Sequence, residues 1–190
     1  YTAMPGFPER FEITCAAELN DTIYVGARPA APFLYHDLMK WGGSGWVGET
    51  VFGGLLPGVS TLFVHDGVLH ASGRTNSVEG NRSRVQRLNG TVWESVGQAL
   101  NAEILCLGYF NGHLICGGSF TRSSQFTVND IQRVAYLDGD TWTQLGDGLD
   151  GTVHDLLVYD NTLYATGDMR STTDTYFGLA RITPEATAWE

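Results

Sequence analysis

The chain has 190 residues, of which 21 are acidic and 11 are basic, giving a formal net charge of −10. This excess of negative charge argues against nucleic acid or an anionic membrane surface as a partner. The length fits one domain, residues 1–190, with a sizeable core, and no apolar stretch is long enough to insert into a membrane as a helix.

A unit of just under fifty residues recurs four times along the chain, and each copy closes on a tryptophan. The four tryptophans stand 47, 49 and 47 residues apart: Trp46, Trp93, Trp142 and Trp189. Self-similarity at a fixed period of this size is the signature of a repeat architecture. We expect each of these indoles to occupy the same structural position and to pack between neighbouring units.

Each copy opens with two apolar runs that are joined by a two-residue turn. The turn pairs are Asn20-Asp21, Asp66-Gly67, Asn111-Gly112 and Asp160-Asn161. Asn and Asp tolerate the left-handed backbone and Gly has no Cβ, so these pairs predict tight β-hairpins. A small residue follows each second run, which indicates close approach of another backbone: Ala27, Gly73, Gly118 and Gly167.

A polar loop, a third strand and a second turn complete each copy before the tryptophan opens a fourth strand. The third strands carry residues 40–41, 85–88, 134–137 and 179–182. Four short antiparallel strands per repeat are typical of a propeller blade. The sequence therefore predicts an all-β fold, most simply a four-bladed β-propeller with blades at about 11–56, 57–101, 102–150 and 151–190. A fragment of a larger propeller is the alternative.

The two ends of the chain are out of phase with the repeat. After Trp189 only Glu190 follows, whereas Tyr1 to Gly6 resemble the Gly-rich segment that follows the other tryptophans. We expect residues 1–10 to supply the outer strand of the last blade. The acceptor is either the same chain, which closes a ring, or a neighbouring copy, which gives a homo-oligomer or polymer by strand addition.

Two stretches of the third copy carry a family resemblance. These are Leu114-Ile115-Cys116-Gly117-Gly118-Ser119-Phe120 and Val134-Ala135-Tyr136-Leu137-Asp138-Gly139-Asp140-Thr141-Trp142. They resemble the kelch-type propeller repeats of bacterial and eukaryotic extracellular proteins. The resemblance implies a propeller and an extracellular or cell-surface location, and it implies little about activity because propellers carry many functions.

Three cysteines leave at least one thiol without a partner in the chain. Cys106 and Cys116 flank the Asn111-Gly112 turn. A three-residue loop would place them opposite each other and permit a cross-strand disulfide, whereas a two-residue loop would point them to opposite faces. A Cys15–Cys106 bridge and buried free thiols are the alternatives.

No catalytic set, phosphate loop or metal-ligand spacing appears in the sequence, and no cofactor is expected. The five histidines are scattered, and Asp138 and Asp140 belong to a predicted hairpin turn rather than to a calcium loop. The polar loops are the expected contact surface for a glycan or a protein. The candidate contact residues are Trp41, which lies outside the tryptophan register, and Arg74, Arg122 and Arg170.

Three Asn-x-Ser/Thr sequences, at Asn20, Asn81 and Asn89, lie in predicted turns and loops and are candidate glycosylation sites. Taken together, these features predict a non-catalytic extracellular structural or assembly module, such as a subunit of a surface appendage, filament or layer. The alternatives are a carbohydrate-binding or adhesin propeller and, third, a propeller enzyme of the glycosidase or lyase type.

Overall fold

The computed structural model describes residues 6–7, 11–29, 36–52, 58–77, 80–123, 131–170 and 177–190. Within these ranges the regular secondary structure is β-strand, in four antiparallel sheets that follow one another along the chain. This confirms the prediction of an all-β fold. We call these sheets 1 to 4 in chain order.

Each sheet is a meander of strands in sequence order. Sheet 1 contains β1 (Phe11–Leu19), β2 (Thr22–Pro29), β3 (Leu38–Trp41) and β4 (Trp46–Glu49). Sheet 2 contains β5 (Gly58–His65), β6 (Val68–Ser77), β7 (Gly80–Asn89) and β8 (Val92–Leu100). Sheet 3 contains β9 (Ile104–Phe110), β10 (His113–Gly118), β11 (Val134–Asp138) and β12 (Thr141–Gln144). Sheet 4 contains β13 (Val153–Tyr159), β14 (Thr162–Arg170) and β15 (Phe177–Ile182).

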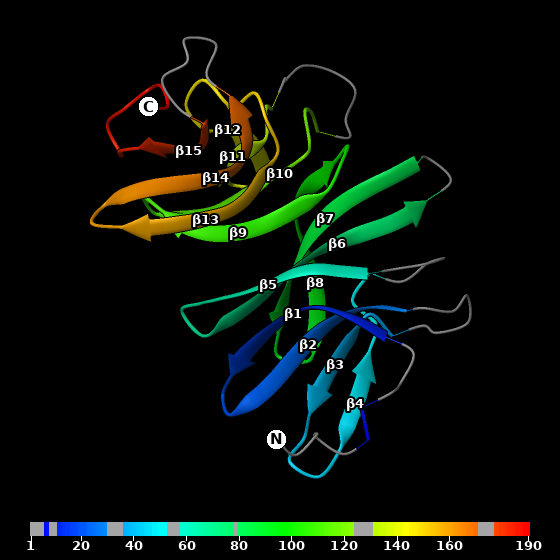
Figure 1. Ribbon diagram of the computed structural model, residues 1–190. Helices are drawn as coiled ribbons and strands as arrows, with labels where there is room; N and C mark the ends of the chain where they lie inside the picture. The colour runs from blue at the N-terminus through cyan, green and yellow to red at the C-terminus, as the bar shows by residue number, and fades with distance from the viewer. Residues whose placement is uncertain are drawn as a thin grey trace.

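In Figure 1, sheet 1 lies at the bottom, sheet 2 lies above it, and sheets 3 and 4 lie together in the upper part, with sheet 4 towards the left. The first strand of each sheet contacts the first strand of the next, so that β1 packs on β5, β5 on β9, and β9 on β13. No contact of this extent joins β13 to β1, both of which the structure describes in full. The series of sheets is therefore open between its first and last members.

The two-residue turns form as the sequence predicts. Asn20 and Asp21 have φ angles of 51° and 58°, and Asp160 and Asn161 have 47° and 54°. These left-handed values suit Asn and Asp, whose short polar side chains tolerate this region. The turns hold each hairpin in a register that repeats from sheet to sheet.

Every first strand carries an irregularity at the same place in this register. The pairing skips one residue between Ile13 and Cys15, and again between Val59 and Thr61 and between Val153 and Asp155. In sheet 3 the skipped residue lies between Ile104 and Cys106. The shared β-bulge turns the side chain of the extra residue and bends the strand. In sheet 1 this residue is Thr14, whose Oγ1 donates a hydrogen bond to the carbonyl of Val59 at 2.6 Å.

The buried apolar residues that the structure describes form three clusters, one between each pair of consecutive sheets. Trp142 of sheet 3 is fully buried in the cluster shared with sheet 2, and Trp189 is buried in the cluster between sheets 3 and 4. Trp93 packs against the cluster between sheets 1 and 2. The described contacts thus support inter-sheet packing for these indoles, and a buried aromatic of this size contributes several kcal/mol.

The small-residue column is explained by backbone contact. A Cβ on Gly118 would collide with the carbonyl oxygen of Glu103, and a Cβ on Gly167 would collide with that of Thr152. Both carbonyls belong to the residue that precedes the first strand of the same sheet. The prediction of close backbone approach after the second strand is therefore confirmed at these two positions.

Of the predicted donor strand, residues 1–10, the structure describes residues 6 and 7, and residues 1–5 and 8–10 lie outside the described residues. Phe7 packs edge-on against Trp46, with ring centroids 4.8 Å apart, and so lies beside sheet 1. In sheet 4, Glu190 exchanges two backbone hydrogen bonds with Arg181, at 2.8 and 3.0 Å. The last residues of the chain thus pair with β15 at the edge of sheet 4, where the sequence predicts that the fourth strand begins.

The β9–β10 hairpin has a two-residue loop, and this loop length determines which faces Cys106 and Cys116 occupy. His113 pairs with Phe110, so Gly117 lies opposite Cys106 and Cys116 lies opposite Leu107. Cys106 faces the cluster between sheets 3 and 4, and Cys116 faces the cluster between sheets 2 and 3. The cross-strand disulfide considered above does not form, because this register points the two thiols to opposite faces. Cys15, Cys106 and Cys116 are all free.

Candidate functional site

A cleft of about 390 Å³ lies between sheets 3 and 4, at the end where the β9–β10 turn projects. Its volume falls in the lower part of the range of small-molecule sites, about 300 to 1,000 Å³. The lining comes from the β9–β10 hairpin, from β11, from the segment that follows β12, and from the turn at residues 183–187 of sheet 4. The cleft therefore depends on how the two sheets dock.

One wall of the cleft is aromatic. The rings of His113 and Tyr136 lie 5.1 Å apart at an interplanar angle of 63°. His113 Nδ1 lies 3.0 Å from the carbonyl oxygen of Leu137, which fixes the imidazole plane and assigns the hydrogen to Nδ1. Phe110 and Ile115 are buried and form the base of this wall. An apolar ring face of this kind suits the C–H face of a sugar ring.

Neutral polar groups line the rest of the cleft. Asn111 stands in the β9–β10 turn with a φ of 49°, and Thr183 and Thr187 come from sheet 4. Gln144 is held in place because its Oε1 accepts a hydrogen bond from the Gln132 amide at 3.1 Å. Among the described residues that line the cleft, none carries a carboxylate. Amide and hydroxyl groups donate and accept hydrogen bonds without charge, which matches the hydroxyl groups of a saccharide.

Trp189 fixes the two sides of the cleft relative to each other. Its indole Nε1 donates to the carbonyl of Leu145 at 3.0 Å, and its backbone amide donates to Asp147 Oδ1 at 3.0 Å. Leu145 itself lines the cleft. Trp189 therefore helps to hold sheet 4 in its position against the wall of the cleft that sheet 3 forms.

A second polar region lies where the first strands begin. Arg74 of sheet 2 pairs with Glu103 of sheet 3 at 3.1 Å, and His154 pairs with Asp168 within sheet 4 at 3.0 Å. Glu103 precedes β9, and Asp168 lies on β14 beside Thr152, which precedes β13. The repeated register places both carboxylates at the same end of neighbouring sheets.

The buried carboxylate of Asp37 holds the loop that leaves sheet 1. Its two oxygens accept hydrogen bonds from the amides of Val51, at 2.6 Å, and Phe52, at 2.9 Å. Burial raises the pKa of Asp37, and these two amides act in the opposite direction because they favour the charged form. Both oxygens are occupied by the backbone, so Asp37 supports the fold.

Of the four predicted contact residues, Trp41, Arg74 and Arg170 lie on sheets 1, 2 and 4, Arg122 lies in the segment that follows β10, and none of the four lines the cleft. Trp41 lies at the end of β3 with its ring 5.4 Å from that of Trp46, and Arg74 forms the ion pair with Glu103. The backbone amide of Arg122 donates to Asn101 Oδ1 at 3.0 Å, and that of Arg170 donates to Asp150 Oδ1 at 2.9 Å. Sequence reasoning missed His113 and Tyr136, because these rings are 23 residues apart in the sequence and meet only when β10 pairs with β11.

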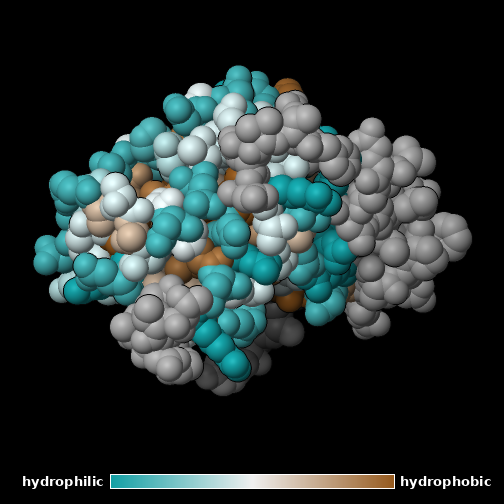
Figure 2. All heavy atoms as spheres, turned by 90° about the horizontal axis from the view of Figure 1, so that it is seen from above, coloured by the Kyte–Doolittle hydropathy of each residue, from teal (hydrophilic) through white to brown (hydrophobic). Residues whose placement is uncertain are grey.

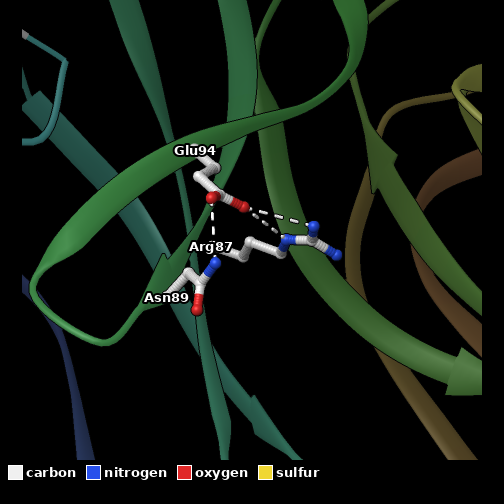
Figure 3. A network of polar contacts seen from close by, with 3 residues as sticks. All are labelled: Arg87, Asn89 and Glu94. Atoms are coloured by element: carbon white, nitrogen blue, oxygen red, sulfur yellow. Dashed lines mark hydrogen bonds and ion pairs between the residues drawn. The ribbon is translucent and has the colours of Figure 1, made fainter.

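The three glycosylation candidates lie in different settings. Asn20 is exposed in the β1–β2 turn. Asn89 donates from Nδ2 to Glu94 Oε1 at 2.9 Å, while Arg87 donates to Glu94 Oε2 from Nε and Nη2, both at 3.2 Å (Figure 3). These bonds, first that from Asn89, lower the pKa of Glu94. The backbone of Asn81 lies in β7, and its side chain is outside the described residues.

Figure 2 shows the molecule from above, where hydrophilic residues cover most of the coloured surface and hydrophobic residues appear in the recesses between them. Within the described ranges, no group of three or more His, Cys, Asp or Glu side chains is arranged to hold a metal ion. The same part of the chain has no helix with the length and apolarity needed to span a bilayer.

Comparison with known proteins identifies the fold. No family model matches the sequence, and no curated protein matches it. Among solved structures, the computationally designed Ika4 protein is similar with a TM-score of 0.55 at 14% identity, covering 95% of each chain. A GH43 β-xylosidase/α-arabinofuranosidase from a compost microbial metagenome, solved with xylotriose, has a TM-score of 0.50 at 8% identity, covering 95% of this chain and 76% of that one.

A GH43_1 enzyme from Xanthomonas citri complexed with xylose has a TM-score of 0.47 at 10% identity, covering 96% of this chain and 73% of that one. The solved structures that resemble the chain thus include a glycoside hydrolase. This finding corrects the prediction of a non-catalytic extracellular structural module, which rested on the absence of a recognisable catalytic set from the sequence. What the chain shares with the designed Ika4 protein and the metagenome enzyme is an all-β, propeller-like fold, which in this chain consists of four antiparallel sheets of three or four strands.

Proposed function

We propose that this chain is a carbohydrate-active protein of propeller type, which binds a short saccharide in the cleft between sheets 3 and 4. The observation that carries the proposal is the lining of the cleft, where the paired rings of His113 and Tyr136 face neutral amide and hydroxyl groups. Sugars are recognised by this combination of an aromatic face for C–H groups and uncharged hydrogen-bonding groups for hydroxyls.

The fold supports the choice of ligand class. The GH43 neighbour was solved with xylotriose, so a neutral xylo-oligosaccharide is the first ligand to test. The net charge of −10 also favours a neutral sugar over a polyanionic one, because acidic polysaccharides would be repelled. In this proposal the four sheets serve as propeller blades, and the docking of sheet 4 on sheet 3 forms the binding site.

The test is a titration with xylotriose followed by calorimetry, in the wild type and in Tyr136→Ala. Loss of the ring should weaken binding about tenfold, equivalent to about 1.4 kcal/mol. Trp41→Ala is the matched control, because Trp41 is a half-buried aromatic on sheet 1, away from the cleft. Equal affinities for the wild type and Tyr136→Ala would refute this site, and loss of affinity in Trp41→Ala alone would move the site to sheet 1.

A second candidate function is glycoside hydrolysis at the beginning of the first strands. Most glycosidases use two carboxyl groups, one as the acid and one as a base or nucleophile. Glu103 and Asp168 stand at the same end of adjacent sheets, each beside a basic partner, Arg74 or His154. We expect release of xylose from xylo-oligosaccharides if this pair is catalytic, and its disappearance in both Glu103→Gln and Asp168→Asn. Hydrolysis that survives both substitutions would exclude the pair.

A further inference from the structure

The shared register allows the four sheets to be compared position by position. The residue just before the bulge of each first strand is Ile13, Val59, Ile104 or Val153. The last three are fully buried, because each packs against the sheet that precedes its own. Ile13 is 58% exposed. Sheet 1 therefore presents an apolar position that every other sheet covers with a neighbour.

The second strands repeat this difference. Leu69, Leu114 and Leu163 occupy equivalent positions in sheets 2, 3 and 4 and are buried, whereas Ile23 of sheet 1 is 37% exposed. Ile13 and Ile23 thus mark one unpaired face, which we call the leading face of sheet 1.

Sheet 4 has the opposite face unpaired. Leu38, Val85 and Val134 stand at one position of the third strands in sheets 1 to 3 and are fully buried, but their equivalent Leu179 is 51% exposed. Leu157 and Tyr159 on β13 are 63% and 69% exposed on the same side. These three residues line a shallow groove of about 270 Å³ with Asp155, Leu156, Tyr164 and Thr166, which we call the trailing face of sheet 4.

We propose that the trailing face of sheet 4 binds the leading face of sheet 1 of a second copy of this chain. In every sheet we call the face towards the preceding sheet the leading face and the face towards the following sheet the trailing face. Each of the three interfaces within the chain then joins the trailing face of one sheet to the leading face of the next. The two uncovered faces are the leading face of sheet 1 and the trailing face of sheet 4, so a second copy would continue the same type of interface. Contiguous exposed apolar residues of this kind mark association surfaces in proteins.

One polar position supports this pairing. Ser72 of sheet 2 donates from Oγ to the carbonyl of Ile104, the pre-bulge residue of sheet 3, at 3.1 Å. Thr166 occupies the position of Ser72 in sheet 4, because each pairs with the residue that follows the bulge. The hydroxyl of Thr166 is thus placed to donate to the carbonyl of Ile13 in the second copy. Among the described residues of one chain, β13 makes no extensive contact with β1. In this proposal the partner sheet therefore comes from another molecule.

The interface is heterologous, because it uses two different faces, and this gives a sharp test. Sedimentation equilibrium should show assemblies of at least twice the 20.7 kDa of one chain. Ile13→Glu and Leu179→Glu should each reduce the mass to that of a single chain, because an unpaired charge cannot be buried in an apolar contact. Val92→Glu is the control, since Val92 is 60% exposed at the start of β8 and belongs to neither face.

Mixing the two disrupted variants provides the decisive measurement. Ile13→Glu retains an intact trailing face on sheet 4, and Leu179→Glu retains an intact leading face on sheet 1. Fluorescently labelled Ile13→Glu should therefore sediment as a heterodimer when unlabelled Leu179→Glu is added in excess. This result also shows that both variants are folded. A wild type that stays at the mass of one chain at high concentration would overturn the proposal, as would a mixture without heterodimer. Loss of association in Val92→Glu as well would also overturn it.

Discussion

Gly97 lies directly against the indole of Trp142, where a Cβ would be 2.5 Å from Nε1. The same relationship recurs one sheet further along, where a Cβ on Gly146 would be 3.2 Å from Nε1 of Trp189. Both glycines have left-handed backbones, with φ angles of 64° and 62°. Each follows the tryptophan of its own sheet by four residues and supports the tryptophan of the next sheet.

Substitution of Gly97 should therefore destabilise the protein by two separate effects. Gly97→Ala forces a side chain into the left-handed region, which costs about 1 to 2 kcal/mol, and overpacks the indole at a further cost of about 1 to 3 kcal/mol. Gly90→Ala is the matched control, since Gly90 has a φ of 62° and no atom within 4 Å of the added Cβ. Urea unfolding of the two variants measures the difference, and equal losses would show that Trp142 does not need the space.

The hydrogen bond between Asp147 and the backbone of Trp189 is a second point of contact between sheets 3 and 4. Asp147→Ala should lower the free energy of unfolding by about 1 to 2 kcal/mol, because it leaves a half-buried amide without an acceptor. Asp140→Ala removes an exposed carboxylate from the β11–β12 turn and should change stability by less than about 0.5 kcal/mol. Chemical denaturation checks both values, and a larger loss in Asp140→Ala would contradict this ranking.

The free thiols predict a specific pattern of reactivity. Burial raises the pKa of both Cys106 and Cys116, so the reactive thiolate is scarce at neutral pH as well as inaccessible. An Ellman titration of the native protein at pH 8 should detect these two thiols only slowly, and Cys15, which is half-buried, should react first. In denaturant all three should react. A count of one thiol without reductant would instead demonstrate a disulfide.

Stability should depend on pH through His70. Burial lowers the pKa of His70 from its ordinary value of 6.5, helped by the nearby charges of Arg87 and His65. The unfolded chain then binds a proton more readily than the native protein, so the free energy of unfolding falls as the pH drops from 6.5 towards the lowered pKa. His70→Gln removes this titration and should flatten the curve between pH 7 and pH 5. An unchanged slope would assign the effect to other groups, and His154→Gln is the exposed-histidine control.

Local chemistry explains why much of the fold is visible in the sequence. The turn pairs, such as Asn20-Asp21, fix left-handed backbone conformations, and these fix the hairpins. The tryptophan spacing reports the period of the sheets, since the indoles of Trp142 and Trp189 fill equivalent places between neighbours. The turn pairs act over a few residues, and the tryptophans recur at a nearly constant interval. Both signals can therefore be recognised without knowing how the sheets dock.

The cleft could not be predicted in the same way. Its walls come from His113 and Tyr136 on one sheet and from Thr183 and Thr187 on another, so it exists only at the angle at which the two sheets meet. The cysteine pairing depended on a one-residue choice of loop length, and Asn111-Gly112 is compatible with either choice. The exposure of Ile13 likewise depends on whether another sheet packs on sheet 1, and the residues around Ile13 do not determine this.

Within the described part of the chain, the extensive strand contacts between sheets join sheets that are consecutive in the sequence. The stability of the fold is therefore approximately the sum of the stabilities of single sheets and of the interfaces between neighbouring sheets, as in a solenoid. Folding can begin at one sheet and spread to the next. Sheets 2 and 3 are each held from two sides, whereas sheets 1 and 4 are each held from one. The chain is thus built to open from its ends inward, with the slowest amide exchange expected in the two middle sheets.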